Sequence, residues 1–330
     1  MSGGGVCVLG AGVVGLGVAL RLLRTGNTRV TIVAEKFSPH TTGDGAAGIW
    51  EPYALGDTRH EDILRWGKET FDWIEGLAQS EEAADCGAFH VQCFHVYREN
   101  VQEPIWRDIV HGFRRMTAKE LQPYPDHNCG FTYTTLISEG RKYLQWLTNR
   151  CKALGATFIQ RKINDLTELS SFDIVVNCSG LGSRELARDT SVQPIKGQII
   201  MVEAPWIKDS RIFFDEGLCL LIGTDRVYVG GTKEVGNEDA TPNPVQSARI
   251  WREMIQLVPS LAKGKRIGEW GGLRPGRQSI RLEAEESNNS ISPQVIHNYG
   301  HGGAGLTLHW GCAAECLRLI YQTCSPQPKL

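Results

Sequence analysis

No stretch of this chain stays apolar for long, and its charges almost cancel. Every apolar run falls short of the roughly 18 residues that a membrane-spanning helix needs, and the sequence does not open with a basic segment followed by an apolar one. We therefore expect neither a membrane span nor a secretion signal. The 35 basic and 37 acidic residues leave a net charge of −2, which gives no indication of a nucleic-acid or membrane partner.

Cysteines at metal-binding spacing are also missing. The ten cysteines are scattered, and none forms a C-x-x-C pair, so we expect neither a zinc site nor a dithiol redox motif. In a reducing compartment all ten should be free thiols. The sequence shows no Ser/His/Asp arrangement and no paired carboxylates that would indicate hydrolytic chemistry. We expect no metal site.

The strongest pattern lies in the first thirty-five residues. Residues 6–9 form an apolar run of strand length, and the glycine-rich residues 10–15 follow at once. Residues 16–23 have helical apolar spacing, and residues 29–34 predict a second strand that ends at Glu35. A strand, glycine turn, helix, strand and acid in this order are typical of a dinucleotide-binding unit.

Each part of this unit has a physical role. Gly10 permits a tight turn, Gly12 lets a pyrophosphate approach the backbone, and Gly15 lets the helix pack close to the strand. The helix N-terminus offers free N–H groups and partial positive charge to the phosphates. Glu35 can accept hydrogen bonds from an adenosine ribose. The alternative is an ordinary strand–helix–strand corner with no ligand.

The remaining segments predict two kinds of layer. Further buried strands end in glycine-rich turns near residues 178 and 300, whereas strands of antiparallel character and helices fill the middle of the chain. Residues 205–223 are expected to be a loop. We predict an α/β fold with a discontinuous Rossmann-like domain of residues 1–55, 155–190 and 285–330. Residues 56–154 and 191–284 would form a second, antiparallel α+β domain.

Five segments carry a resemblance to a known family, namely residues 8–16, 41–48, 176–180, 273–283 and 297–307. Through them the chain resembles the flavin-dependent D-amino-acid oxidases and D-aspartate oxidases from about residue 5 to residue 322. The last segment is close to that family's own signature, whereas the first is shared by many unrelated proteins. The resemblance implies an FAD-binding domain and a substrate domain, with the isoalloxazine ring at their interface.

The resemblance also implies where FAD is held. The expected contacts are Gly10, Gly12, Val13, Val14, Gly15, Glu35, Lys36, Thr41, Thr42, Ala47, Gly48, Ile49, Ile163, Ser179, Gly302, Gly303, Ala304, Gly305, Leu306 and Thr307. Glu35 and Lys36 match the adenosine end, and the glycine turn from residue 302 matches N–H groups that face the flavin pyrimidine oxygen.

The chemistry that the resemblance implies is oxidative deamination of a D-amino acid. Arg281 matches the arginine that grips the substrate α-carboxylate, and the carbonyl of Gly303 could take the amine. Hydride transfer to the flavin depends on orientation more than on an acid–base residue, so we expect His297, His301 and His309 to be structural. Oxygen would reoxidise the flavin, and the products would be a 2-oxo acid, ammonia and hydrogen peroxide.

Two departures bear on the substrate. The stretch that matches a lid, residues 209–222, is short and contains no tyrosine; Leu220 stands where a carboxylate-binding tyrosine is expected, with Tyr228 as a conceivable substitute. Lys233 matches a basic position of D-aspartate oxidases. We expect a preference for acidic D-amino acids, with neutral D-amino acids as the alternative. A non-catalytic dinucleotide sensor or an NAD(P) dehydrogenase is the third possibility.

The C-terminal residues Pro328-Lys329-Leu330 resemble the Ser-Lys-Leu peroxisomal address. We therefore predict the peroxisomal matrix and recognition by an import receptor. The sequence leaves open whether the protein is a monomer or a homo-oligomer.

Overall fold

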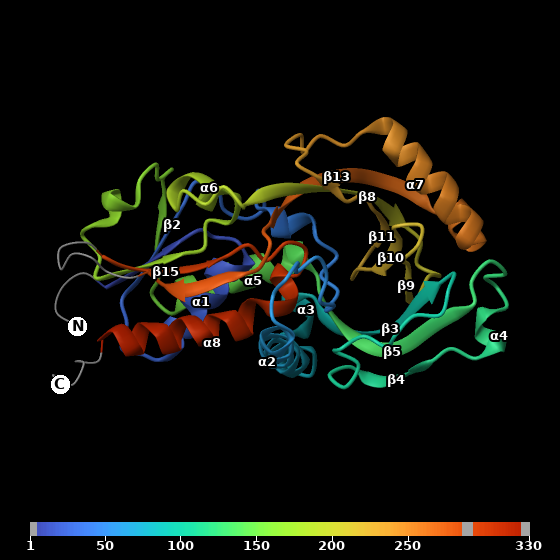
Figure 1. Cartoon of the computed structure of the whole chain (residues 1–330), viewed down its shortest axis with the longest axis horizontal. Coiled ribbons are helices and arrows are strands. Elements are labelled where there is room, and N and C mark those ends of the chain that lie inside the picture. The colour runs from blue at the N-terminus through green and yellow to red at the C-terminus, as the bar shows by residue number, and fades with distance from the viewer. Residues whose placement is uncertain (1–4, 286–292, 325–330) are drawn as a thin grey trace.

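The computed structural model describes residues 5–285 and 293–324. A six-stranded sheet forms one half of the molecule, in the strand order β14-β15-β7-β1-β2-β6 (Figure 1). All neighbours pair in parallel except β14 with β15. The strands are β1 (Val6–Leu9), β2 (Val30–Ala34), β6 (Thr157–Gln160), β7 (Ile174–Asn177), β14 (Arg281–Ala284) and β15 (Gln294–Tyr299). Helix α1 (Val13–Arg24) joins β1 to β2, which pair in parallel, as in a dinucleotide-binding unit.

Four long helices pack together beside this sheet: α1 (Val13–Arg24), α2 (His60–Ala78), α5 (Gly140–Ala153) and α8 (Gly305–Cys324). Helix α1 lies against α8 and α5, and α2 lies against the other side of α8 (Figure 1). Leu16 and Leu20 of α1 are buried against strand residues such as Val8 and Ile32, which have no exposed surface. The apolar spacing of the helix therefore matches its buried face.

A second sheet forms the other half, in the order β12-β8-β11-β10-β9-β3-β5-β4, and β13 also pairs with β8. Its described strands pair antiparallel except β3 with β9. They are β3 (Ala88–Tyr97), β4 (His111–Arg115), β5 (Cys129–Ser138), β8 (Gln193–Glu203), β9 (Ser210–Phe213), β10 (Leu218–Ile222), β11 (Val227–Gly230), β12 (Glu234–Val235) and β13 (Lys265–Gly276). Helix α7 (Pro244–Leu257) covers one face (Figure 1). The predicted α/β class with a mainly antiparallel second layer is confirmed.

Two segments differ from the sequence prediction. Residues 205–223 contain the β9–β10 hairpin, which is paired on both sides within the second sheet, rather than a loop. Strand β14 belongs to the parallel sheet, although the predicted boundary placed residues up to 284 in the other domain. The chain crosses between the sheets just after β13. The division into two domains remains a prediction, in which β14 now belongs to the dinucleotide-binding domain.

Among residues 5–285 and 293–324, the helices are too short or too polar to cross a membrane.

Candidate active site

A cavity of about 1520 Å³ lies between the two sheets. The carboxyl ends of β1, β2, β7 and β15 open onto it, and strands β8, β10, β11 and β13 supply the opposite wall. A crevice at the carboxyl ends of parallel strands is where open α/β sheets bind ligands. Its volume exceeds the roughly 300–1,000 Å³ of a pocket for one small molecule, so it has room for a long cofactor and a substrate together.

The glycine turn after β1 has the shape that a pyrophosphate requires. Gly10 has a φ of 113°, and a side chain there would overlap the carbonyl of Cys178; one at Gly15 would overlap the carbonyl of Gly10. At Gly12, by contrast, no described residue has an atom within 4 Å of an added Cβ. Gly10 and Gly15 are therefore needed for packing, whereas Gly12 leaves a space open to the cavity.

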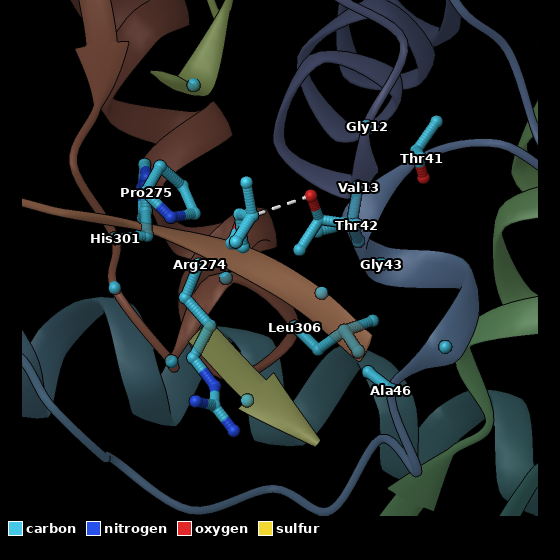
Figure 2. A pocket seen from close by; sticks show the side chains of 18 of the residues that line it. Gly12, Val13, Thr41, Thr42, Gly43, Ala46, Arg274, Pro275, His301 and Leu306 are labelled. Carbon is cyan, nitrogen blue, oxygen red and sulfur yellow. Dashed lines mark hydrogen bonds between the residues drawn. The ribbon is translucent and has the colours of Figure 1, made fainter. Parts of the chain in front are cut away.

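The helix that follows this turn supports the same assignment. Gly12 is the N-cap of α1, and among the described residues no side chain caps the helix or places an acid in its first turn. The N–H groups of the first turn are then available to an anion, and the helix dipole favours one there. Figure 2 shows Gly12 and Val13 at the rim of the cavity, and Val14 also lines it.

The other predicted positions along the parallel sheet also reach the cavity. Glu35 and Lys36 follow β2 and line the cavity, with Glu35 exposed. Ile163 is buried in the same wall. Ser179 lies after β7, where its Oγ donates to Asn177 Oδ1 at 2.7 Å.

A buried carboxylate fixes the loop at residues 41–49. Asp44 accepts from the backbone N–H of Thr41 at 2.8 Å and from Thr41 Oγ1 at 2.7 Å, and it also binds Ser38. Thr42 Oγ1 donates to the carbonyl of Leu273 at 3.2 Å, which ties the loop to β13 (Figure 2). The predicted residues Thr41, Thr42, Ala47, Gly48 and Ile49 all line the cavity.

An indole ring is enclosed by two glycines in the same region. A side chain at Gly45 or at Gly272 would overlap the ring of Trp270, which lines the cavity. The loop after β2 and strand β13 can therefore approach each other only because both positions lack a side chain.

The turn before α8 forms the floor beside the first glycine turn, since a side chain at Gly305 would lie 3.6 Å from Cγ1 of Val13. Gly302 has a φ of 53° and lies against the carbonyl of Ala54, and Gly303 lies against the ring of Tyr53. Gly302, Gly303, Gly305 and Leu306 line the cavity. Because α8 begins at Gly305, a second helix N-terminus faces the cavity.

Three predicted cofactor contacts are not among the described residues that line the cavity: Gly15, Ala304 and Thr307. Ala304 has no exposed surface, and Thr307 is 2% exposed. Thr307 Oγ1 donates to the carbonyl of Glu51 at 2.9 Å and accepts from the N–H of the same residue. These residues hold the turn in place behind the wall.

Two cations meet at one aromatic ring in the wall formed by the second sheet. The Arg274 guanidinium lies 5.9 Å from the centroid of the Tyr53 ring, and Lys233 Nζ lies 5.7 Å from the same centroid. Arg274 also donates to the carbonyl of Thr232 at 3.1 Å. In Figure 2 its side chain points away from Gly12 and Val13. This part of the cavity suits an anion with two negative groups.

The structure does not bring Arg281 to this place. Arg281 lies on β14, at the edge of the parallel sheet, and is not among the described residues of the cavity wall. It donates to Glu283 at 2.7 Å and to Tyr299 Oη at 2.8 Å. The chain has already crossed to the other sheet by this point, whereas Arg274 is still on β13. Of the arginines at 274, 277 and 281, Arg274 is the one that lines the described cavity.

Strand geometry also decides which way Leu220 and Tyr228 point. Leu220 stands where a lid tyrosine was expected, and Tyr228 was considered as its substitute. Leu220 has no exposed surface and points into the core of the second sheet, whereas its neighbours Cys219 and Leu221 line the cavity. Tyr228 lines the cavity, but its hydroxyl donates to buried Glu139 at 2.5 Å. Desolvation and this carboxylate raise the pKa of Tyr228 above its ordinary value. Its hydroxyl is thus already engaged within the protein.

The three histidines that were expected to be structural, His297, His301 and His309, are buried and neutral. Desolvation lowers the pKa of His301 to about 4 and that of His309 to about 3. Burial, with the Arg281 charge nearby, lowers the pKa of His297 to about 4. His309 Nδ1 lies 2.9 Å from the carbonyl of Leu306, and its Nε2 lies 2.8 Å from Tyr143 Oη. These contacts suit a neutral imidazole with a structural role.

Sequence reasoning missed four carboxylates in the described cavity wall, those of Glu51, Glu185, Glu216 and Glu234. Glu51 lines the cavity, and its Oε1 lies 3.2 Å from Nε2 of buried His95. Glu51 and Arg274 each precede a proline, and only Arg274 lies in one of the five segments that carry the resemblance. Whether these two side chains face the cavity depends on how the two sheets meet. The local amino-acid pattern does not encode this.

Comparisons with known proteins agree with this geometry. The FAD dependent oxidoreductase family profile matches residues 5–319. D-aspartate oxidase of Homo sapiens is 41% identical over 321 residues, with 96% of this chain and 94% of the relative covered. D-amino acid oxidase of Dugesia ryukyuensis is 35% identical, with 96% and 97% covered. The solved glycine oxidase of Geobacillus kaustophilus superposes with a TM-score of 0.81 at 18% identity, over 96% of this chain and 94% of that one.

Proposed function

Because the chain belongs to the FAD-dependent oxidoreductase family, we propose that it oxidises D-amino acids and favours those with an acidic side chain. The observation that carries the acidic preference is the pair of cations, Arg274 and Lys233, on the ring of Tyr53. The cofactor is FAD, as the family and the glycine turn at Gly12 both indicate. The reaction consumes oxygen and water and yields a 2-oxo acid, ammonia and hydrogen peroxide.

The residues of the cavity fit FAD. The first turn of α1 would bind the pyrophosphate, and Glu35 would accept hydrogen bonds from the adenosine ribose. The loop held by Asp44 and the N-terminus of α8 would enclose the ring system. FAD supplies the acceptor for the hydride of the substrate Cα.

The chain's own contribution is to orient the substrate. The planar Arg274 fork can bind the α-carboxylate through two parallel hydrogen bonds, and the Gly303 carbonyl can accept from the substrate amine. Lys233 would then hold a side-chain carboxylate as a point charge. Neither the neutral buried histidines nor the engaged Tyr228 hydroxyl is required as a base, because orientation of Cα is the main demand of hydride transfer.

Peroxide formation over a panel of amino acids tests the proposal. We expect the purified yellow protein to form peroxide with D-Asp and D-Glu, to do so less efficiently with D-Ala and D-Pro, and to be inactive with the L-enantiomers. A higher kcat/KM for D-Ala than for D-Asp would show that the enzyme prefers neutral D-amino acids. A protein that binds FAD but forms no peroxide with any of them would remove the oxidase assignment.

We also propose a peroxisomal location. Pro328-Lys329-Leu330, which lies outside the described residues, resembles a peroxisomal address, and a peroxide-forming oxidase is suited to a compartment that destroys peroxide. Deletion of Lys329 and Leu330 should move a fluorescent fusion, tagged at its N-terminus, from peroxisomes to the cytosol. An unchanged distribution would show that the tail is not read by an import receptor.

A further inference from the structure

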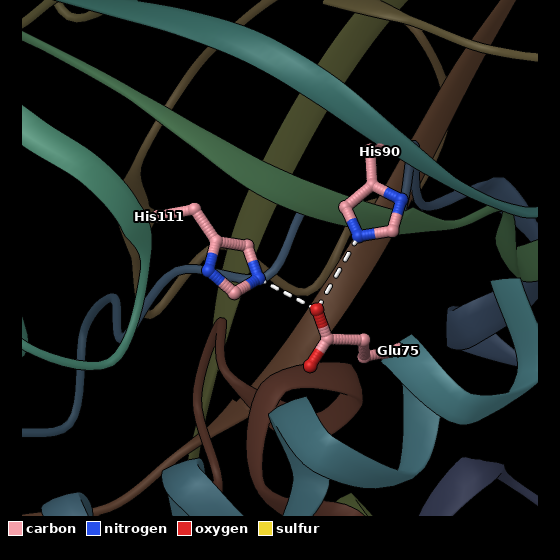
Figure 3. A group of neighbouring side chains, drawn as sticks. All are labelled: Glu75, His90 and His111. Carbon is pink, nitrogen blue, oxygen red and sulfur yellow. Dashed lines mark hydrogen bonds and ion pairs between the residues drawn. The ribbon is translucent and has the colours of Figure 1, made fainter. Parts of the chain in front are cut away.

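Three potential metal ligands converge at a place remote in sequence from the cofactor loops. Glu75 comes from α2, His90 from β3 and His111 from β4, and their ligand atoms all lie within 4.8 Å of one another. Figure 3 shows both imidazole rings directed at the same carboxylate. We propose that these three side chains form a binding site for Zn²⁺. The inference does not depend on the enzymatic activity.

Hydrogen bonding accounts for only half of this arrangement. His111 Nε2 lies 2.6 Å from Glu75 Oε1, which is a short hydrogen bond, but His90 Nε2 lies 3.5 Å from the same oxygen. A separation of 3.5 Å is long for a hydrogen bond. The two rings nevertheless point at one oxygen, so three potential ligand atoms converge although only one of the two contacts has hydrogen-bond length.

A tetrahedral zinc ion explains the convergence better. Zinc–nitrogen and zinc–oxygen bonds of about 2.0–2.2 Å place neighbouring ligand atoms roughly 3.3–3.5 Å apart. The contact between His90 and Glu75 already has this length, and the His111 contact needs to open by less than about 1 Å. Two imidazoles and one carboxylate are also a donor set that zinc uses when it keeps a fourth position for water.

The supporting structure orients the ligands. Phe71, one helical turn before Glu75, is 1% exposed and packs its ring edge against His111, with the centroids 5.4 Å apart. The pairing of β4 with β5 is irregular between His111 and Arg114, and Gly112 in this bulge has a φ of 62°. Bulges redirect side chains at sheet edges, and here the bulge adjoins a ligand.

The three ligands are accessible to an ion from solvent. The side chains of His90 and His111 are 35% and 51% exposed, and that of Glu75 is 24% exposed, so an ion can enter and a water can complete its coordination. The expectation of no zinc site rested on cysteine spacing, and no cysteine takes part in this cluster.

Bound zinc would fasten the edge strand β4 to α2. Strand β4 ends the second sheet, and α2 packs on α8 of the other half. An ion with ligands from α2, β3 and β4 would therefore join the margin of one half to a helix of the other. Ligands that bind only the folded state raise its stability.

Calorimetric titration of the FAD-bound enzyme with ZnCl₂ tests the proposal, with tag-free protein that has been freed of metal by a chelator. We expect one Zn²⁺ per chain, a higher thermal midpoint with zinc, and slower amide exchange in residues 111–115. Glu75→Gln and His111→Ala should each weaken binding by more than the roughly 10- to 100-fold that loss of an outer-shell partner costs. Mg²⁺, which prefers oxygen ligands, should not replace zinc.

The matched control is His60→Ala, which removes an exposed histidine from the start of the same helix. It should bind zinc like the parent. Circular dichroism and flavin absorbance check that each variant is folded, and His90→Ala gives a second ligand deletion if His111→Ala is not. Absence of zinc binding by the parent, or binding that survives both ligand deletions, would overturn the site. Loss of binding in His60→Ala would do so as well.

Discussion

The guanidinium of Arg274 and the ammonium of Lys233 share one aromatic neighbour, yet they can recognise different things. A guanidinium presents a rigid fork that matches a carboxylate, whereas an ammonium is a compact charge on a flexible stem. Every α-amino acid has an α-carboxylate, so the fork suits the group common to all substrates. The point charge suits a side-chain carboxylate, which differs in position between D-Asp and D-Glu.

Arg274→Lys should lower kcat/KM by more than tenfold for D-Asp and D-Ala alike, a loss above roughly 1.4 kcal/mol in transition-state stabilisation. The change keeps the charge but removes the fork. Steady-state peroxide assays with both substrates measure it. Arg281→Lys is the matched control, since Arg281 lies outside the described cavity wall; it should stay within about threefold of the parent. If Arg281→Lys lowers kcat/KM more than Arg274→Lys does, Arg281 and not Arg274 binds the α-carboxylate.

Lys233→Ala should lower kcat/KM for D-Asp about ten- to a hundredfold, because a hydrogen bond to a charged group contributes about 1.5–3 kcal/mol. The value for D-Ala should change little. Lys233→Arg, which keeps a cation, should recover part of the D-Asp activity. If the two substrates lose activity equally, Lys233 does not contact the side-chain carboxylate, and its role is confined to the wall of the cavity.

Among the secondary structure elements, α1 offers the sharpest test of cofactor binding. A valine at Gly12 would fill space that the described residues leave open, and that space faces the cavity. We expect Gly12→Val to fold but to lose flavin absorbance at 450 nm on purification, with FAD affinity reduced by at least about tenfold. Quenching of FAD fluorescence on titration of the apoprotein measures the affinity.

Gly76→Val provides the comparison for this variant. Gly76 lies within α2, and an added side chain there would likewise meet none of the described atoms. It should keep its flavin, since the residue is not among those that line the cavity. If both variants retain full flavin absorbance, the pyrophosphate does not lie against Gly12.

Elements with strong local pattern were predictable, and elements that depend on distant partners were not. Strands β1 and β7 are continuous apolar runs, and α2 has a clear apolar stripe, so each is encoded in its own residues. The β9–β10 hairpin has strands of four and five residues that are held by β3 and β11. Such short strands give little local signal, because their stability comes from pairing across the sheet.

The same distinction applies to the arginine that lines the cavity. Residues 274, 277 and 281 lie close together in sequence, and the first two flank a Pro-Gly pair. Which of them faces the cavity depends on where the chain leaves one sheet and joins the other. That crossing is fixed by the pairing of β13 with β8, which is distant in sequence, and of β14 with β15, the next described strand. The family resemblance identified residues 273–283 as a segment of the site. Which of its arginines lines the cavity is seen only once the two sheets are assembled.

For the molecule as a whole, the buried histidines predict an acid-sensitive fold. The pKa values of His297, His301 and His309 are lowered to about 4, 4 and 3, against 6.5 for an exposed histidine. Unfolded chains bind more protons than the native state below pH 6.5, so this stabilisation is complete above pH 6.5. It is lost as the pH falls from there through about 4, at up to roughly 1.4 kcal/mol per pH unit for each histidine.

Urea unfolding with excess FAD between pH 7.5 and 5 should therefore show a falling midpoint below pH 6.5. Between pH 7 and 8 these histidines should contribute no slope. His309→Gln, which can keep the hydrogen bond to the carbonyl of Leu306, should flatten the acid limb relative to the parent. An equal slope in parent and variant would mean that His309 already carries a proton in the native state.

The enclosure of Trp270 by Gly45 and Gly272 constrains how this protein can change over time. A side chain at either glycine meets the indole ring, so either substitution requires the ring to move from its present position. Replacement of Trp270 by a smaller residue removes this requirement at both positions at once. Changes at residues 45, 270 and 272 are therefore coupled: what one position accepts depends on the residue at the others, because all three share the volume of one ring.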